Sequence, residues 1–362
     1  MAQLSVKPDA NIMAQAIACA ERGIYTTGQA LNFAVVLVSQ GQVVQAVGQG
    51  FHTSTCVVTR ALEQLDAAEQ ACDCAYLTSE PSLNAVAQLA EAGVTQLIVA
   101  CQLEPAENTW LKLCDERGIK VEIGLLAQQA LALNHDYVFR KNHHRPFVRL
   151  KMAASLDGRT ALQNGQSKWI TSAQARQDVQ MFRAKSDVIL SGSGTVIADD
   201  PSLNVRWQEV VSLHDLISEQ QLRQPARVII DNRLQLDQRY RLFHLPGETY
   251  LVASQAHPNP AAKTILVEQQ EGHICLASLM TKLAQMGVNN VWVEAGETLA
   301  GALFAQGLVD EFILYQAPKL MGSLSRGLLA LPEYTNMTQV PELDIAQIDK
   351  IGPDLRLICT LK

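Results

Sequence analysis

Hydrophobic positions in the first 140 residues alternate between helical and extended spacing. Residues 11–22 place apolar side chains at helical intervals and stop before Gly23, which predicts a helix. Residues 33–51 predict two strands around a glutamine-rich turn at 39–42. The same pattern predicts helices at 57–71, 82–92, 106–117 and 125–139, and strands at 74–78, 95–100 and 119–123. Strand–helix alternation of this kind indicates an α/β domain.

A second alternating pattern follows a polar stretch at residues 141–146 that ends in proline. We place a domain boundary near Arg145, which gives domains at 1–145 and 146–362. The second pattern predicts helices at 172–184, from about 195, at 276–286 and at 297–306, and strands at 146–155, 187–190, 226–231, 248–253, 263–267, 290–294, 310–316 and 355–361. The second domain is therefore also expected to be α/β.

Charge and composition narrow the possible partners and location. The chain has 362 residues, with 29 Lys and Arg against 36 Asp and Glu. A net charge of −7 argues against binding to nucleic acid or to an anionic membrane surface. No window approaches the roughly 18 uninterrupted apolar residues of a membrane span. The N-terminus does not have the pattern of a secretory signal, so we expect a cytoplasmic protein.

Eight cysteines and eight histidines raise the question of a metal site. Six of the cysteines fall in the first third of the chain: Cys19, Cys56, Cys72, Cys74, Cys101 and Cys114. In a long cytoplasmic protein such a cluster favours metal binding or catalysis over disulfides. However, Cys72 and Cys74 have no second pair at zinc spacing. Cys19, Cys101 and Cys114 lie on apolar faces, where cysteine behaves as a small hydrophobic residue.

Residues 293–303 predict a strand that runs through Gly296 into a helix. Backbone N–H groups and the helix dipole at such a turn can bind a phosphate. Gly296 and Gly301 are two glycines rather than the three of a dinucleotide-binding fingerprint. Close packing at a helix start explains this pattern equally well.

A second candidate segment covers residues 191–206. We interpret Asp200, before a proline, as part of a solvated turn. Asp199 is a stronger candidate because the same half supplies Arg183 and Arg206, and arginine suits bidentate binding of phosphate. Trp169 follows polar residues and could cover a flat ligand instead of joining the core.

The second half contains, in order, ASLDGRTAL, GQSKWIT, ARQDVQ, GTVIADDPSLNVRW, RQPARVIID, VWVEAGETLAGALFAQGLVDE and APKLMG. Together these stretches closely resemble the reductase half of the bifunctional riboflavin-biosynthesis deaminase–reductase family. The resemblance implies a dihydrofolate-reductase-like α/β fold and a homodimer formed through the reductase domains. It also implies NADPH-dependent reduction of the ribosyl chain of 5-amino-6-(5-phosphoribosylamino)uracil to a ribityl chain.

Position by position, the resemblance also implies site residues. The implied cofactor contacts are Ala153, Trp169, Thr195, Asp199, Gly296, Glu297, Thr298, Leu299, Ala300, Gly301 and Ala302. The implied substrate contacts are Ser167, Arg183, Leu203, Arg206 and Glu294. Hydride transfer to an open-chain imine needs a proton donor, for which Asp199 is our first candidate and Lys151 our second. We expect Asp199→Asn to lower turnover and to leave NADPH binding largely intact.

The first half resembles the zinc-dependent pyrimidine deaminase domain of the same family through IMAQAIACAERGIYTT, AYLTSEP and EAGVTQLIVACQLEP. The resemblance implies a cytidine-deaminase-like three-layer α/β/α fold. The family's H-A-E motif reads Val57-Val58-Thr59 here, and its P-C motif reads Pro81-Ser82. The loop before the family's last cysteine is shortened, which leaves Ala85-Val86 in place of that cysteine. Its proline-asparagine substrate turn is replaced at residues 28–31. These side chains can neither bind zinc nor transfer the proton that deamination requires. We therefore expect neither bound zinc nor deaminase activity.

Two other hypotheses remain open at this point. The chain could be a reductase of the same fold that acts on a different ribosylated or pteridine-like substrate. It could instead be a non-catalytic partner that binds a nucleotide or pairs with an active deaminase. The joint presence of Arg183, Asp199, Arg206 and Glu294 argues against a non-catalytic partner.

Overall fold

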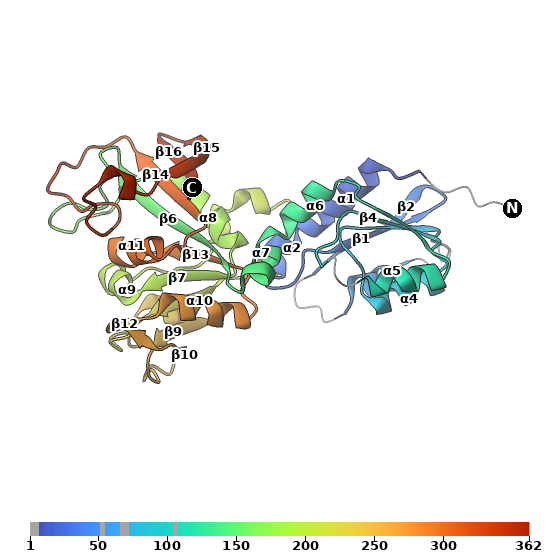
Figure 1. Cartoon of the computed structure of the whole chain (residues 1–362), viewed down its shortest axis with the longest axis horizontal. Helices are drawn as coiled ribbons and strands as arrows, with labels where there is room; N and C mark the ends of the chain where they lie inside the picture. Colours follow the sequence, from blue (N-terminus) through green and yellow to red (C-terminus); the bar gives the residue numbers. More distant parts are fainter. Residues whose placement is uncertain (1–6, 51–54, 66–71, 105–107, 362) are drawn as a thin grey trace. The chain divides into compact units, whose positions relative to one another are not determined.

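The structure, a computed structural model, describes residues 7–50, 55–65, 72–104 and 108–361. The chain divides into two compact units (Figure 1). Unit 1 consists of Met1–Val138 and Asp215–Arg223, and unit 2 consists of Phe139–His214 and Gln224–Lys362. A short piece of the second half thus belongs to the first unit. Within the described part of the chain, no helix has both the length and the apolar character needed to cross a membrane.

Unit 1 is built around a five-stranded mixed sheet with the strand order β2-β1-β3-β4-β5. β1 is antiparallel to β2 and β3, whereas β3, β4 and β5 are parallel. The strands are β1 (Ala34–Ser39), β2 (Gln42–Gly48), β3 (Cys74–Leu77), β4 (Gln96–Val99) and β5 (Lys120–Ile123). The helices are α1 (Ala10–Glu21), α2 (Gly23–Thr26), α3 (Val57–Glu63), α4 (Leu83–Glu91), α5 (Thr109–Glu116), α6 (Ala127–Leu133) and α7 (His135–His143), of which α7 runs on into unit 2.

Strand β1, which lies between β2 and β3, shows why the sheet of unit 1 is a middle layer. Successive side chains of a strand point to opposite faces. Val35 and Leu37 accordingly join a hydrophobic cluster with residues of α3, α4 and α5. Val36 and Val38 join a second cluster with residues of α1 and α6. Unit 1 is therefore a three-layer α/β/α structure.

Unit 2 is built around a nine-stranded sheet with the order β10-β9-β8-β7-β13-β6-β14-β16-β15. Neighbouring strands from β10 to β14 are parallel, and β16 and β15 are added antiparallel at one side. These strands are β6 (Phe147–Ser155), β7 (Val188–Gly192), β8 (Ala226–Ile230), β9 (Thr249–Ala253), β10 (Lys263–Leu266), β13 (Asn290–Glu294), β14 (Glu311–Ala317), β15 (Leu343–Ile351) and β16 (Asp354–Leu361).

Helices cover both faces of this sheet. They are α8 (Ala173–Lys185), α9 (Ser193–Asp199), α10 (Leu276–Gln285) and α11 (Glu297–Ala305). Residues of α10 and α11 pack on one face, and residues of α8 and α9 on the other. A separate hairpin joins β11 (Gln269–Gln270) to β12 (His273–Ile274). Short 3-10 helices are η1 (Trp207–Glu209), η2 (Val211–Leu213), η3 (Glu219–Gln221), η4 (Arg241–His244) and η5 (Met337–Gln339).

The structure confirms most of the predicted elements and corrects two. The predicted helix at 125–139 is two helices, α6 and α7, separated at Asn134. The Asn134 side chain accepts a hydrogen bond from the backbone N–H of Asn32 (2.9 Å) and donates one to the Asn32 carbonyl (3.2 Å). These bonds join the break between the two helices to the segment that leads into β1. The predicted helix at 57–71 ends at Glu63, and residues 66–71 lie outside the described ones.

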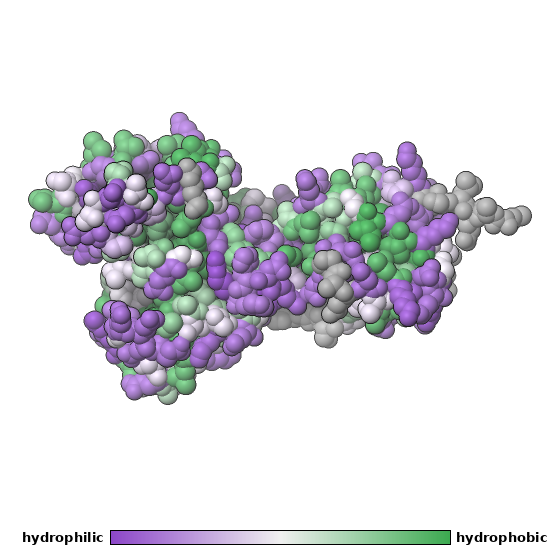
Figure 2. All heavy atoms as spheres, in the orientation of Figure 1, coloured by the Kyte–Doolittle hydropathy of each residue, from purple (hydrophilic) through white to green (hydrophobic). Residues whose placement is uncertain are grey.

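A further difference is strand β15, which the hydrophobic pattern did not predict. Most of its residues are exposed, so they lack the alternation between buried and exposed side chains that identifies a strand. Figure 2 shows hydrophobic atoms at the surface over β15 and β16, and Ile345 and Ile348 of β15 are 55% and 58% exposed. The sheet thus ends in an outer strand with an apolar surface.

Candidate active site

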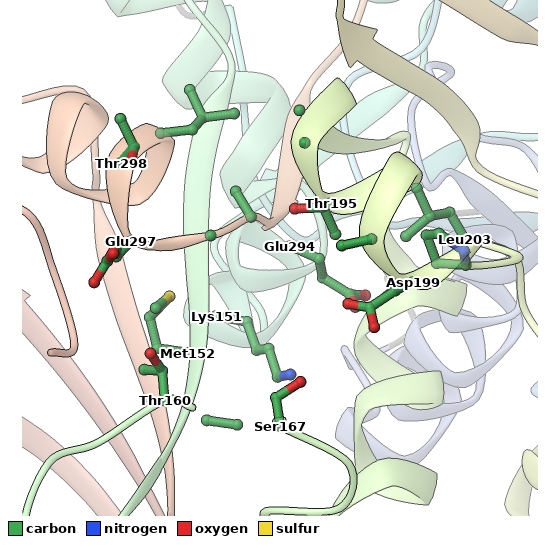
Figure 3. Close-up of a pocket in the computed structure, with 18 of the residues that line it drawn as sticks. Lys151, Met152, Thr160, Ser167, Thr195, Asp199, Leu203, Glu294, Glu297 and Thr298 are labelled. Carbon is green, nitrogen blue, oxygen red and sulfur yellow. The ribbon is translucent and has the colours of Figure 1, made fainter. Parts of the chain in front are cut away.

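A cavity of about 1540 Å³ opens in unit 2 at the carboxyl ends of the parallel strands (Figure 3). In open parallel sheets this edge is where ligands bind. Residues of β6, β7, β8 and β13 reach the cavity. Its wall includes Lys151, Ala153, Ser167, Trp169, Arg183, Thr195, Asp199, Leu203, Arg206 and Glu294. The structure therefore brings these predicted site residues together from distant parts of the chain.

Lys151 and Glu294 lie beside each other because of the strand register. They are paired positions on the adjacent parallel strands β6 and β13, and both point to the face that carries α8 and α9. Arg183 of α8 completes the group. Its Nε and Nη2 donate to the two carboxylate oxygens of Glu294 at 2.6 and 2.9 Å. Both side chains are largely buried, at 9% and 15% exposed.

Two further contacts fix this ion pair. The indole Nε1 of Trp292 donates to Glu294 Oε1 at 2.8 Å, and the Trp292 ring stacks on Phe182 at 4.9 Å. Arg183 Nη1 donates to the carbonyl of Asn204 at 2.8 Å. The carboxylate and the guanidinium therefore have defined positions before any ligand binds.

The charges in this group shift one another's ionisation. Burial by itself would raise the pKa of Glu294, but the charge and hydrogen bonds of Arg183, together with the charge of Lys151, lower it to about 2. Burial lowers the pKa of Lys151, and Glu294 opposes this shift while Arg183 adds to it. At neutral pH Glu294 is therefore ionised, and Lys151 gives up a proton more readily than an exposed lysine does.

Asp199 ends α9 on another part of the cavity wall. Its carboxylate lies 3.1 Å from the ammonium group of Lys168, and the two side chains are 39% and 54% exposed. Figure 3 shows Asp199, Glu294 and Lys151 pointing into the same part of the pocket. Asp199 thus has a more hydrated position than Glu294.

Trp169 is not a core residue. Its side chain is 63% exposed, and the guanidinium of Arg176 lies 4.3 Å from the ring centroid. Lys319 Nζ donates to the Trp169 carbonyl at 2.7 Å. This position fits the interpretation that the indole covers a ligand.

The loop that carries Ser167 and Trp169 is anchored at its other end by Asp157. The Asp157 carboxylate accepts hydrogen bonds from the hydroxyl of Ser155 and from the backbone N–H groups of Met321 and Gly322. These bonds lower the Asp157 pKa to about 2, the Ser155 bond being the largest cause. Asp157 therefore joins the loop that follows β6 to the loop that follows β14.

The segment after α9 contains Asp200 and Arg206, and both side chains make specific contacts within the protein. Asp200 adopts a left-handed conformation, with φ of 40°, and accepts a hydrogen bond from the backbone N–H of Arg241 at 2.8 Å. It is thus a specifically bonded turn residue rather than only a solvated one. Arg206 donates to Glu209 through Nε and Nη2 at 2.5 and 2.9 Å. Arg206, like Arg183, therefore already has a carboxylate partner.

The first turn of α11 forms another wall. Gly296 caps the helix without a side-chain hydrogen bond, and a side chain added there would meet open space. Of the implied cofactor contacts on this helix, Gly296, Glu297, Thr298, Leu299 and Ala302 line the cavity. Ala300 and Gly301 are buried on the other side of the helix, where a Cβ on Gly301 would lie 2.2 Å from the Ala330 carbonyl oxygen. Close packing thus explains the second glycine.

Several wall residues were not singled out from the sequence. They are Thr160, Arg176, Gln180, Arg241, His273 and Arg326, among others. Arg176 and Gln180 precede Arg183 at helical spacing on α8, so periodicity could have identified them. Arg241 and His273 lie in connections that have no motif, and only the tertiary fold places them here.

In unit 1, most of the positions where the resemblance expects zinc ligands belong to the hydrophobic core, and Ser82, at the expected P-C cysteine, is the exposed N-cap of α4. Val57 and Val58 begin α3 and are 2% and 0% exposed, and Ala85 and Val86 of α4 have the same values. All four join one cluster. The Thr59 hydroxyl, at the family's glutamate position, donates to Gln88 Oε1 at 2.8 Å. Among the described residues, no group of three or more His, Cys, Asp and Glu is arranged to hold a metal ion.

A parallel sheet with a cavity at its carboxyl edge and an uncapped helix start in the wall is typical of α/β proteins that bind a phosphate-containing ligand such as a nucleotide. A family model described as RibD C-terminal domain matches residues 146–357. The riboflavin biosynthesis protein RibD of Escherichia coli strain K12 is 38% identical over 364 residues, 96% of this chain and 98% of that protein.

Two further comparisons agree with this match. The structure of Acinetobacter baumannii RibD has a TM-score of 0.86 and 32% identity, and the match covers 98% of each chain. The 5-amino-6-(5-phosphoribosylamino)uracil reductase of Buchnera aphidicola (subspecies Acyrthosiphon pisum) is 39% identical over 205 residues, 56% of this chain and 99% of that protein. The chain belongs to the RibD family of bifunctional riboflavin-biosynthesis deaminase–reductases. Unit 1 has the cytidine-deaminase-like fold and unit 2 the dihydrofolate-reductase-like fold of that family.

Proposed function

We propose that unit 2 reduces 5-amino-6-(5-phosphoribosylamino)uracil to its ribitylamino form with hydride from NADPH. The observation that carries this proposal is the buried Arg183–Glu294 pair beside Lys151 in the cavity wall. A buried ionic group with shifted pKa values in a cleft marks a candidate catalytic site. Family membership supplies the substrate class.

The wall of the cavity fits a dinucleotide cofactor. Gly296 leaves the start of α11 open, so the N–H groups of its first turn can meet a pyrophosphate. We propose that Ala153, Thr195, Asp199 and Trp169 complete this site, with the exposed indole of Trp169 covering the cofactor or the substrate ring. NADPH, when bound, supplies the hydride.

Lys151 and Asp199 remain our two candidates for proton transfer. Reduction adds a hydride to C1 of the open-chain imine and a proton to its nitrogen. The Lys151 ammonium carries a proton, and burial lowers its pKa, so it is suited to donate. Asp199 is ion-paired with Lys168 and is suited to accept hydrogen bonds from ligand groups. We therefore favour Lys151 as the donor.

The substrate contacts follow from the same wall. We propose that Ser167, Leu203 and Glu294 bind the pyrimidine and sugar, and that Arg183 and Arg206 bind the phosphate. Because Glu209 already pairs with Arg206, the phosphate has to share this guanidinium with the carboxylate or displace it.

We further propose that unit 1 has lost the family's deaminase activity and binds no catalytic zinc. The supporting observation is that Val57, Ser82 and Ala85-Val86 stand where the resemblance expects the ligands: Val57, Ala85 and Val86 are buried in the core, and Ser82 caps α4. Zinc requires nitrogen, sulfur or carboxylate ligands, and deamination requires a proton-transferring glutamate. Another protein then has to supply the deaminated substrate.

We also propose a homodimer through unit 2. Ile345 and Ile348 are more than half exposed on β15, which lies at the end of the sheet. An exposed strand edge with apolar side chains is unfavourable unless it is covered.

Complementation tests these activities separately. The gene is introduced into a reductase-deficient and into a deaminase-deficient riboflavin auxotroph, with NADPH oxidation by the purified protein measured in parallel. We expect growth of the first strain only, and NADPH oxidation only when the phosphoribosylamino substrate is present. Growth of the second strain would contradict the loss of deaminase activity. Failure to oxidise NADPH would contradict the proposed reductase.

A further inference from the structure

The segment Asp215–Arg223, here called the strap, interrupts unit 2. The chain leaves unit 2 after His214, contributes the strap to unit 1, and returns to unit 2 at Gln224. Just before the strap, residues 203–209 form what we call the substrate loop, which carries Leu203 and Arg206 into the cavity wall. The residues on both sides of the strap are bonded to this loop.

Gln224 is bonded to the middle of the substrate loop in both directions. Its Oε1 accepts from the backbone N–H of Val205 at 2.9 Å, and its Nε2 donates to the Val205 carbonyl at 3.0 Å. Val205 is 2% exposed, and the loop's next amide, that of Arg206, donates to Gln180 Oε1 at 3.0 Å. These three bonds fix the backbone from which Leu203 and Arg206 extend.

His214 holds the same loop at a second point. Its Nε2 lies 3.0 Å from the Trp207 carbonyl oxygen, and its ring stacks on the Trp207 ring at 4.3 Å. The loop is thus bonded at residue 205 by the residue after the strap and at residue 207 by the residue before it.

The strap itself is a built element. Ile217 and Leu222 are only 6% and 7% exposed, and the backbone N–H of Arg223 donates to the Tyr25 carbonyl at 2.9 Å. Ser218 and Gln221 form a capping box around η3. A segment with buried apolar side chains and a capped turn has few accessible conformations, so it restrains the chain at both of its ends.

We propose that Gln224 is a positioning residue for the reductase, and that the strap, by restraining the chain at both of its ends, fixes the substrate loop. This inference rests on the proposed function in one respect, since it takes Leu203 and Arg206 as substrate contacts.

The first test is Gln224→Ala, with the exposed strap residue Gln220→Ala as the matched control. We expect the KM for the phosphoribosylamino substrate to rise about tenfold, the effect of losing roughly 1.4 kcal/mol of binding. We expect kcat to change less than about threefold and the NADPH Kd to stay the same, because α11 and the strands hold the cofactor. Gln224→Glu keeps the hydrogen-bond acceptor and loses the donor, so its substrate KM should lie between those of the wild-type protein and Gln224→Ala.

The second test separates the strap from the hydrogen bonds. The double variant Ile217→Ser, Leu222→Ser removes the apolar anchors of the strap and keeps Gln224 and His214. Hydrogen exchange is measured at the amides of the substrate loop in this variant, in Gln224→Ala and in the wild-type protein. We expect faster exchange at Val205 in both variants, together with the higher substrate KM and an unchanged NADPH Kd.

Unchanged exchange and unchanged KM in the double variant would overturn the role of the strap, and the same result in Gln224→Ala would overturn the role of that residue. Loss of NADPH binding in either variant would show general unfolding and would contradict a specific positioning role. In that case Gln224→Glu decides the question for Gln224: NADPH binding retained together with a raised substrate KM would support the positioning role. Should the wild-type protein fail to reduce the substrate, the proposed function fails, while the exchange measurement still decides whether the strap fixes the loop.

Discussion

Lys151 and Glu294 are paired positions on adjacent strands, so the backbone itself keeps an ammonium and a carboxylate together in a poorly hydrated wall. Arg183 makes the group a triad with a net positive charge. Such a site is suited to an anionic substrate that needs a proton. The arrangement leads to two predictions at the scale of single residues.

Replacing Lys151 with arginine should remove the alkaline limb of the pH–rate profile. A lysine donor must be protonated, so kcat should fall as pH rises through the Lys151 pKa, which burial lowers. A guanidinium stays protonated throughout, with a pKa above about 12, and donates poorly. We expect Lys151→Arg to lower kcat by about 10²-fold or more and to make it independent of pH between about 7 and about 10. Retention of the alkaline fall in this variant would assign it to another group.

Glu294→Gln should lower stability at neutral pH and make stability less sensitive to acid. The folded-state pKa of Glu294 is lowered from 4.5 to about 2, so ionised Glu294 stabilises the fold fully above about pH 4.5. This stabilisation is lost as the pH falls toward 2. Removing one partner of a buried pair costs about 3–5 kcal/mol. Urea unfolding at neutral and acidic pH measures both effects. Glu248→Gln, which breaks the exposed pair with Lys263, is the control and should cost less than about 1 kcal/mol.

At the scale of elements, α11 shows how tightly one helix is fitted. Gly301→Ala would place a methyl group 2.2 Å from the Ala330 carbonyl oxygen, so helix and loop have to move apart. We expect a loss of about 1–3 kcal/mol in the free energy of unfolding, as for other overpacked sites. Gly327→Ala meets no atom within 4 Å and serves as the control. If Gly301→Ala were as stable as the control, the segment at Ala330 would have moved without cost, and the predicted loss of stability would be wrong.

Element prediction from sequence succeeded where burial imposes a period and failed elsewhere. β1, β7 and β13 are buried on both faces, and their apolar runs identified them. β15 is exposed along most of its length, so no period marks it. The break between α6 and α7 depends on hydrogen bonds between Asn134 and Asn32, about 100 residues earlier, which local spacing does not contain.

At the scale of the whole molecule, most of the site residues that the family motifs predicted do line the cavity. The motifs could not predict that Glu294 pairs with Arg183, or that Arg206 pairs with Glu209, because these partners are set by packing. Nor could they predict the strap, since its sequence carries no motif. Cysteine counts were similarly uninformative, because all eight cysteines are free and five of them are buried.

The molecule as a whole should be a reductase that needs no metal. We expect the purified protein to contain far less than one zinc per chain, because valine, serine and alanine stand where the resemblance expects the histidine and cysteine ligands. We also expect its NADPH oxidation to be unchanged by a chelator. Elemental analysis and a rate measurement with and without chelator check this, with a zinc-containing deaminase as the control. Stoichiometric zinc would show a ligand set other than the aligned one.

The order of strands in unit 2 has a consequence for how the chain is made. β6 pairs with β13 and β14, which are synthesised more than a hundred residues later. The five strands of unit 1 pair within residues 34–123, so they can associate while unit 2 is still incomplete. Both edges of β6 meanwhile remain open, and an open strand edge invites pairing with other chains. A chain that ends between residues 156 and 310 contains β6 but lacks β14, so at least one of these edges stays bare and we expect such truncated chains to aggregate.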